Sequence, residues 1–340
     1  MSRTAKKTEL INCHICQSYK YKKILTKFEM NLVKCMECGL VYANPILQES
    51  ELFKRYADSF FYDEYLPAFK ALPTYYDLDV IRSHFFIFLQ LIAKFFTPGK
   101  RLLDVGCGAG FFLKAAEETG WEAEGVELSS VASKYAKNIV KVKVHEGKLE
   151  DLHLPADKFD LVALIDTIEH LRNPLLTLKE INRILAKEGI LLIGTPDFDS
   201  LSRLLLRGSW AVLSPEEHFS IFSHNTLSYI IQKANFRVLG IRNLLQFNPE
   251  YTHDKKRLSY YMFKSLNKRL ESLKKMEKTQ LYEYADIMLI EEKNPKNIQN
   301  FNSDLNPARR TKRTIHKWSK KWLRGDTLVA VAKKTNGKKT

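Results

Sequence analysis

The chain has 340 residues, which is enough for one large domain with attached segments and excludes a single small module. Its 54 Lys and Arg exceed its 39 Asp and Glu, and the net charge of +15 favours acidic partners such as nucleic acid, anionic lipid or phosphorylated substrates. No apolar run follows Met1, and the most apolar stretch, residues 85–96, is too short to span a bilayer. We therefore expect a cytoplasmic protein, with peripheral contact to a membrane left open.

Residues 1–9 are basic and polar, and we expect a disordered start. Two C-x2-C pairs follow, separated by 18 residues, and they hold four of the five cysteines: Cys13, Cys16, Cys35 and Cys38. This spacing predicts a zinc ribbon over residues 10–45, because each pair turns two thiolates toward one tetrahedral ion. Disulfides and free thiols are the alternatives. Four cysteines close the coordination shell, so we expect structural zinc with His14 as a bystander.

Residues 46–98 are rich in aromatic and charged side chains, including Tyr56, Phe60 and Tyr65. They predict a helical segment that serves as a lid or substrate wall, or that only joins the ribbon to the core. A helix over 81–96 is expected to end at Pro98-Gly99.

A buried strand over 102–105 then runs into a glycine turn and a helix. The turn reads Asp104-Val105-Gly106-Cys107-Gly108-Ala109-Gly110, and its glycines allow a sharp bend and close approach to a ligand. Phe111 stands where a dinucleotide-binding G-x-G-x-x-G needs its third glycine, which disfavours that motif. The D-x-G-x-G-x-G pattern instead resembles motif I of the class I S-adenosylmethionine (SAM) methyltransferases.

The second predicted strand, 121–127, ends in Glu127, whose carboxylate can accept both ribose hydroxyls of a nucleoside. A third strand over 140–145 precedes a turn. The resemblance implies that Leu149 in this turn packs on the adenine and that Glu150 binds its amino group. It also adds Asp166, at the end of the fourth strand (159–166), to the cofactor-binding residues. That strand lacks the N/D-P-P-aromatic motif of many amino-directed methyltransferases, which disfavours methylation of a base nitrogen.

A fifth strand is expected over 189–196, a sixth over 236–247 and a seventh over 326–332. The pattern H-x-x-x-F-S-x-x-T-L begins at His218, between the fifth and sixth of these strands. Together with the ribbon and the glycine turn, this pattern resembles the type 23 methyltransferases, which are related to the ubiquinone-biosynthesis O-methyltransferases. Because an imidazole accepts a proton near neutral pH, His218 is the candidate catalytic base, although a packing role remains the alternative. His170 is a weaker candidate.

The predicted fold is α/β: a Rossmann-like, seven-stranded methyltransferase sheet, mostly parallel with the last strand antiparallel. The cofactor domain covers 99–250 and 325–335. Residues 251–324 form a helical basic insertion with 19 Lys and Arg against 8 Asp and Glu, together with Trp318 and Trp322. This insertion is a candidate surface for an anionic membrane or for nucleic acid, or a solvated excursion.

The leading hypothesis is a SAM-dependent enzyme that methylates an oxygen or carbon atom of a small-molecule, sugar or lipid-linked acceptor. An RNA methyltransferase is one alternative, favoured by the basic insertion. A SAM-binding adaptor without turnover is another, and the complete glycine motif argues against it. The sequence identifies neither the acceptor nor the oligomeric state.

Overall fold

A computed structural model of the chain describes residues 7–51, 60–94, 99–243 and 326–335. The chain divides into two compact units. The first comprises Met1–Phe198, Val212–Leu244 and Thr327–Thr340, and the second comprises Asp199–Ala211 and Leu245–Asp326. No helix within the described ranges has both the length and the apolar character needed to cross a membrane.

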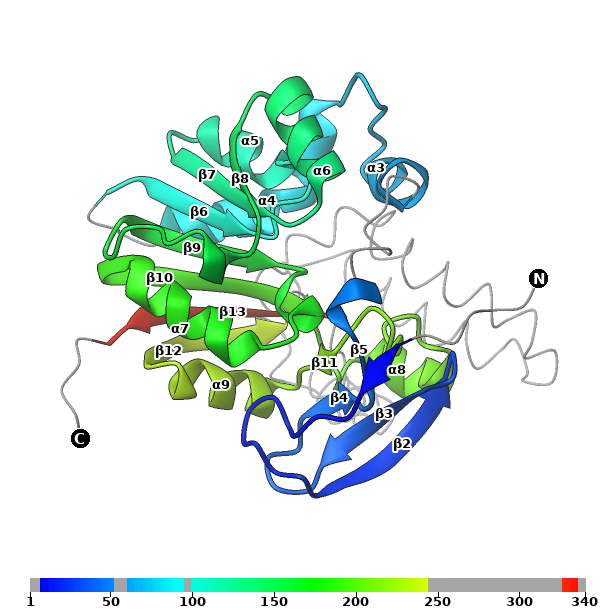
Figure 1. The fold of residues 1–340 in the computed structure, drawn as a ribbon. Coiled ribbons are helices and arrows are strands. Elements are labelled where there is room, and N and C mark those ends of the chain that lie inside the picture. The colour runs from blue at the N-terminus through cyan, green and yellow to red at the C-terminus, as the bar shows by residue number, and fades with distance from the viewer. Residues whose placement is uncertain (1–6, 52–59, 95–98, 244–325, 336–340) are drawn as a thin grey trace, which may run out of the picture. The chain divides into compact units, whose positions relative to one another are not determined.

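A seven-stranded sheet forms the centre of the first unit, in the order β12-β13-β10-β9-β6-β7-β8 (Figure 1). The strands are β6 (Arg101–Val105), β7 (Glu122–Glu127), β8 (Lys143–Glu146), β9 (Phe159–Ile165), β10 (Leu185–Pro196), β12 (Phe236–Asn243) and β13 (Thr327–Lys334). The pairs from β10 to β8 are parallel, and β13 runs antiparallel to both of its neighbours. The predicted sheet, with its last strand antiparallel, is confirmed.

Apolar strands and capped helices build this unit. All of β9 except its last residue is buried, as a central parallel strand covered on both faces requires. The helices are α4 (Leu78–Lys94), α5 (Phe111–Glu117), α6 (Ser130–Tyr135), α7 (Pro174–Ile184) and α9 (His224–Lys233). Helix α9 begins at Ser223 with a reciprocal capping box to Thr226, and it lies beside α7 along the sheet (Figure 1).

An ion pair ties β6 to β9 at the edge where both strands begin. The guanidinium of Arg101 donates to both carboxylate oxygens of Asp160 at 2.9 Å, and the Arg101 backbone N–H adds a third hydrogen bond. Asp160 is 1% exposed. Because Arg101 holds the charged form, the pKa of Asp160 lies below its usual value.

The ribbon is a four-stranded antiparallel sheet whose order is β11-β4-β3-β2. Strands β2 (Tyr21–Lys27), β3 (Met30–Cys35) and β4 (Val41–Ala43) come from the N-terminal segment, whereas β11 (Ser220–Ile221) comes from the loop before α9. The expected ribbon segment 10–45 therefore supplies only three of the four strands. Lys233, in α9, also donates to the backbone carbonyl of Ile15 at 3.0 Å.

The ordered chain begins earlier than expected. β1 (Thr8–Glu9) pairs with β5 (Ile46–Leu47), and the carboxylate of Glu9 forms an ion pair with Arg172. Thr8 and Glu9, which were predicted to be disordered, thus form backbone hydrogen bonds with β5, which is distant in sequence.

The remaining boundaries differ by a few residues from the expected ones. Helix α4 starts at Leu78 rather than 81. The other helical elements described within the predicted linker 46–98 are a π-helical turn, Phe61–Tyr65, and α3 (Leu66–Ala68). In the second unit, α8 (Leu201–Leu206) begins at Ser200, whose side chain accepts a hydrogen bond from the Arg203 backbone N–H. The basic insertion 251–324 and the end of the predicted sixth strand lie outside the described residues.

Candidate active site

The glycine turn follows β6 and opens α5, as the sequence predicts. Gly106, Gly108 and Gly110 all have positive φ, at 77°, 54° and 76°, which a side chain would strain. Asp104 ends up 3% exposed, and no described side chain or backbone group makes a hydrogen bond to its Oδ1. Burial, together with the nearby carboxyl of Glu127, raises the pKa of Asp104 well above its usual value.

Glu127 lies at the end of β7, beside the glycine turn. Its Oε2 accepts a hydrogen bond from the Gly108 backbone N–H at 2.8 Å, and its Oε1 accepts one from Ser129 at 2.7 Å. Burial raises the pKa of Glu127 even though these donors act in the opposite direction. The structure thus brings together two carboxylates that the sequence assigned to one ligand.

This arrangement fits a SAM molecule. Two buried carboxylates with raised pKa values lack cationic partners among the described residues, and SAM carries an ammonium, a sulfonium and two ribose hydroxyls. The glycine turn adds a backbone surface without Cβ atoms, against which a ligand can lie closely. Donors on the cofactor would therefore supply what the buried carboxylates lack.

Tyr65 is a site residue whose position the sequence does not reveal. Its hydroxyl lies 3.4 Å from the Ala109 backbone N–H, and a Cβ added to Gly108 would meet that hydroxyl at 2.2 Å. Burial raises the pKa of Tyr65, so the hydroxyl stays neutral. Its aromatic segment was predicted as a lid or a joining helix, and the structure places this one ring directly over the glycine turn.

The other predicted cofactor residues lie beyond the neighbouring strands. Leu149 is 2% exposed in a 3-10 turn, and Glu150 accepts a hydrogen bond from Thr177 in α7. Asp166 follows β9 with a positive φ of 50°, and although much of the residue is accessible, partial desolvation of its carboxyl by the protein around it raises its pKa to about 6. An accessible carboxyl in such crowded surroundings is typical of a group that lines a ligand site rather than the core.

His218 and His170 come together, with their ring centroids 4.8 Å apart. The Nδ1 of each ring lies 2.7 Å from a backbone carbonyl, that of Val212 for His218 and that of Glu217 for His170. Because a carbonyl oxygen only accepts, each neutral ring carries its proton on Nδ1 and keeps a lone pair on Nε2. Two imidazoles are thus fixed as acceptors of a proton or as ligands of a cation.

Glu169 completes this cluster, and the sequence analysis had not assigned it a role. It is 2% exposed, accepts a hydrogen bond from Thr195 Oγ1 at 2.9 Å, and has its pKa raised well above the usual value by burial and by Asp166. One potential ligand atom from each of Glu169, His170 and His218 lies within 4.8 Å of the others. Glu169 and His170 are neighbours in the sequence, but no local pattern indicates that His218 lies beside them in the fold.

The four ribbon cysteines also come together. The Sγ atoms of Cys13 and Cys38 lie 3.4 Å apart, as do those of Cys16 and Cys35, and one atom from each of the four lies within 4.8 Å of the rest. A tetrahedral zinc ion with Zn–S bonds of about 2.3 Å needs sulfurs about 3.8 Å apart, so the set fits that ion. All five cysteines are free thiols. The hydrogen bond between Cys13 and Cys38 lowers the pKa of Cys38 and raises the pKa of Cys13, so without a metal the two thiols share one negative charge.

Comparisons with known proteins bear on the domain that carries this site. Residues 82–240 match the sequence profile of a methyltransferase domain, type 23. The fold is similar to the crystal structure of a SAM-dependent methyltransferase from Archaeoglobus fulgidus, with a TM-score of 0.50 and 19% identity over 82% of this chain and 100% of the other. Over residues 82–240 the chain therefore resembles a type 23 methyltransferase domain, and its fold is similar to that of a known SAM-dependent methyltransferase.

Relatives with curated names are similar over part of this chain. The ubiquinone biosynthesis O-methyltransferase of Haemophilus ducreyi is 30% identical over 107 residues, which is 28% of this chain and 45% of that protein. Its counterpart from Alkalilimnicola ehrlichii is 26% identical over 162 residues, which is 46% of this chain and 53% of that protein. The chain spans about half the length of the curated relatives it matches.

Proposed function

We propose that this methyltransferase transfers the methyl group of SAM to an oxygen or carbon atom of a small-molecule, sugar or lipid-linked acceptor. The names of the curated relatives support an acceptor hydroxyl. SAM supplies an electrophilic methyl group, and the departing S-adenosylhomocysteine takes the electron pair of the broken S–CH3 bond. The chain's own contribution is to bind and orient both molecules and to accept the proton that the acceptor loses.

His218 is the group that we assign to the proton. Its Nδ1–H donates to the Val212 carbonyl at 2.7 Å, which fixes the ring with the proton on Nδ1 and the lone pair on Nε2. Asp104, Gly106, Gly108, Gly110, Glu127, Leu149, Glu150 and Asp166 are the residues that we assign to SAM. Zinc at Cys13, Cys16, Cys35 and Cys38 has a structural role in this proposal, because four thiolates leave no coordination position for a substrate.

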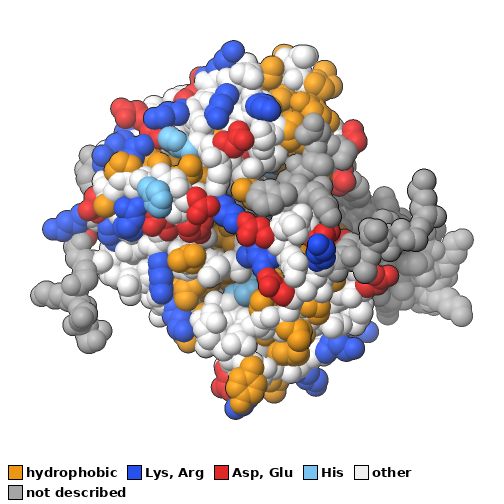
Figure 2. Space-filling view, viewed as in Figure 1, with side chains coloured by type: hydrophobic (Ala, Val, Ile, Leu, Met, Phe, Trp, Pro, Cys, Tyr) orange, Lys and Arg blue, Asp and Glu red, His pale blue; other side chains and the backbone are white. Residues whose placement is uncertain are grey.

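A small acceptor is favoured over RNA by the surface of the described residues. On the face seen in Figure 2, Lys and Arg are interspersed with Asp and Glu rather than gathered into one basic tract. An RNA-binding groove needs a continuous basic path along the phosphate backbone. RNA as the acceptor is therefore the second candidate, since the basic composition of residues 251–324 still favours it.

The test is to incubate the full chain with methyl-labelled SAM and fractionated cell extract, and to follow the label into small molecules, lipid and RNA. His218→Ala should lower turnover by about 10²- to 10⁴-fold, the range for a lost general base, without changing SAM affinity. His224→Ala, at the exposed start of α9, is the matched control and should keep full turnover.

Label found only in RNA would replace the proposed acceptor class, and SAM binding without label in any fraction would favour the adaptor hypothesis. An unchanged rate in His218→Ala would return this residue to a packing role. Turnover that requires added Mg²⁺ or Mn²⁺, in protein that retains its zinc, would assign Glu169, His170 and His218 to a cation instead of a base.

A further inference from the structure

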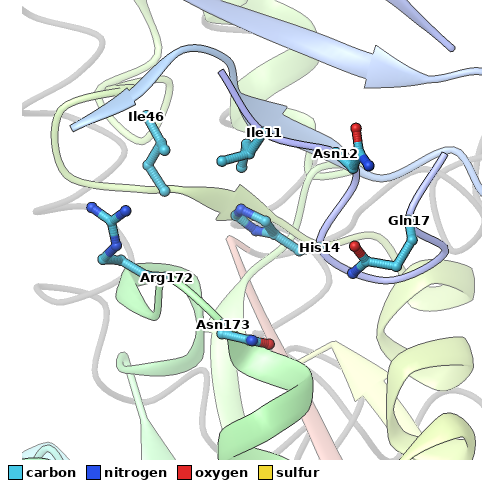
Figure 3. Close-up of a pocket in the computed structure, with 7 residues that line it drawn as sticks. All are labelled: Ile11, Asn12, His14, Gln17, Ile46, Arg172 and Asn173. Carbon is cyan, nitrogen blue, oxygen red and sulfur yellow. The ribbon is translucent and has the colours of Figure 1, made fainter. Parts of the chain in front are cut away.

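A pocket separates the first cysteine pair of the ribbon from the start of α7. It has a volume of about 240 Å³, and Figure 3 shows its seven lining residues: Ile11, Asn12, His14, Gln17, Ile46, Arg172 and Asn173. Five of the seven carry polar side chains. The imidazole of His14 extends from the ribbon toward Arg172 on the opposite wall (Figure 3).

His14 is buried in an incomplete hydrogen-bond arrangement. It is 6% exposed, and its Nδ1 lies 2.7 Å from the hydroxyl of Ser220 in β11. Its Nε2, also buried, has no hydrogen-bond partner among the described residues. A buried polar atom without a partner costs about 1–3 kcal/mol, so a group in this pocket that bonds Nε2 is favoured. When the Ser220 hydroxyl donates to Nδ1, the proton of the ring is on Nε2 and points away from Ser220.

The opposite wall supplies positive charge. Arg172 donates to the Leu47 carbonyl and to the Glu9 carboxylate, which uses two of the five N–H groups of its guanidinium. Asn173 follows as the N-cap of α7, a helix of 11 residues. Its Oδ1 accepts from the Leu176 backbone N–H at 3.1 Å, so its NH2 group remains to donate. The positive end of the helix dipole therefore opens at the same wall.

We propose that this pocket binds a compact oxyanion, a phosphate or a carboxylate group. His14 Nε2–H, the remaining N–H groups of Arg172 and the amide of Asn173 are the donors. Three kinds of donor line this one pocket, together with a guanidinium charge and a helix N-terminus, which is the chemistry that recognises an anion of this size. The Glu9 carboxylate offsets part of the charge, so the site favours an anion that also accepts hydrogen bonds over one held by charge alone.

The pocket adjoins the histidine cluster along the chain. Arg172 follows His170 by two residues, and Ser220 follows His218 by two. The oxyanion is therefore either a free ion that fixes these two segments or an anionic group on the acceptor itself. The second source rests on the proposed function, whereas the first does not.

The experiment is calorimetric titration of the zinc-loaded full chain with inorganic phosphate, and separately with acetate. His14→Phe keeps an aromatic ring and removes both nitrogens, and Asn173→Ser keeps a good N-cap for α7 while removing the amide donors. Lys179→Ala, on the exposed side of α7, is the control that removes one positive charge from the same helix. SAM affinity and zinc content are measured for every variant.

Phosphate should bind wild type with a stoichiometry near one at this site. His14→Phe should weaken that binding by at least tenfold and Asn173→Ser by several-fold, while Lys179→Ala leaves it unchanged. If wild type binds no phosphate and no acetate, or if all three variants are equally affected, the pocket is not an anion site. Either result would overturn this inference. Unchanged SAM affinity in the same variants would leave the proposed function standing.

A second measurement separates the two sources. Phosphate that inhibits label transfer in wild type but not in His14→Phe would identify the anion as a group of the acceptor. Binding of phosphate without inhibition would identify a free ion.

Discussion

Two carboxyl groups define the cofactor site at the scale of single residues. Asp104 and Glu127 are both buried and burial raises both pKa values, and the carboxyl of Glu127 further disfavours ionisation of Asp104. Such a pair is unfavourable for the protein alone, and cationic and hydroxyl groups of a ligand relieve it. The site therefore binds its ligand at the expense of stability in its absence.

Glu127→Gln should weaken SAM binding by about 10- to 100-fold, because a charged hydrogen-bond acceptor contributes about 1.5–3 kcal/mol. Glu122→Gln, at the exposed opposite end of the same strand, is the matched control and should bind SAM as wild type does. Calorimetry with SAM measures both. Equal affinity of the two variants would contradict the assignment of Glu127.

SAM affinity should also depend on pH through Asp166, whose pKa is about 6. The anionic form of this carboxyl attracts the sulfonium more than the neutral form does, so affinity should rise between pH 5 and 7. For each unit by which bound SAM lowers the pKa of Asp166, SAM affinity at high pH should exceed that at low pH by about a further factor of ten. Asp166→Asn should flatten this rise, whereas Asp79→Asn, at an exposed position near the start of α4, should not. The same slope in both variants would exclude Asp166 from the site.

Much of the site could be predicted from local patterns. Short sequence patterns are enough to predict the glycine turn, Glu127 and the four cysteines. In each case the spacing between nearby residues determines how their side chains are placed. Tyr65 and Glu169 could not be found in this way. Tyr65 meets Ala109 across 44 residues, and Glu169 meets Thr195 across 26, and no periodicity encodes such contacts.

At the scale of elements, the ends of strands carry both function and stability. The carboxyl ends of β6, β7 and β9 present the acidic residues assigned to SAM, while the opposite ends of β6 and β9 are joined by Arg101 and Asp160. The alternation of apolar strands and helices predicted this sheet. The addition of β11 to the ribbon was not predictable, because a pair of only two residues leaves no hydrophobic pattern in the sequence.

Arg101→Met should lower the free energy of unfolding by about 1–3 kcal/mol. Breaking a buried pair costs about 3–5 kcal/mol, and we reduce this value because Arg101 is nearly half exposed. The pKa of Asp160 is lower in the folded protein than in the unfolded chain. The ion pair therefore stabilises the fold at pH values above the unfolded-state pKa, and this stabilisation disappears as the pH falls through the folded-state pKa. Urea unfolding of this variant and of Arg237→Ala, an exposed control, at pH 7 and pH 3 measures the difference. It should shrink at pH 3, and a difference that is equal at both values would contradict the pairing.

At the scale of the whole first unit, the ribbon and the loop of His218 share one sheet. Ala43 donates its backbone N–H to the Phe219 carbonyl at 3.1 Å, and Phe219 donates to Glu169 at 2.8 Å. Phe219, the residue next to His218, therefore links the ribbon to the histidine cluster by backbone hydrogen bonds on both sides. Its metal should influence turnover although it touches no substrate.

The purified chain should carry about one zinc ion, and Cys35→Ser should lose it. This variant should turn over at least tenfold more slowly while its SAM affinity changes little, because β11 loses its support and the glycine turn does not. Cys107→Ser is the control for metal content and should retain zinc. Metal analysis and single-turnover rates test both statements, and a zinc-free variant with normal turnover would separate the ribbon from catalysis.

The pairing of β4 with β11 also has a consequence for the order in which the protein is made. Cys38 leaves the ribosome roughly 180 residues before Ser220, which is an interval of tens of seconds at about 5–20 residues per second. All four thiols are thus available to a metal long before the ribbon sheet is complete. During that time the outer edge of β4 presents unpaired backbone groups to other nascent chains. Its length of three residues makes it a poor template for them, and this brevity protects the ribbon until its fourth strand is synthesised.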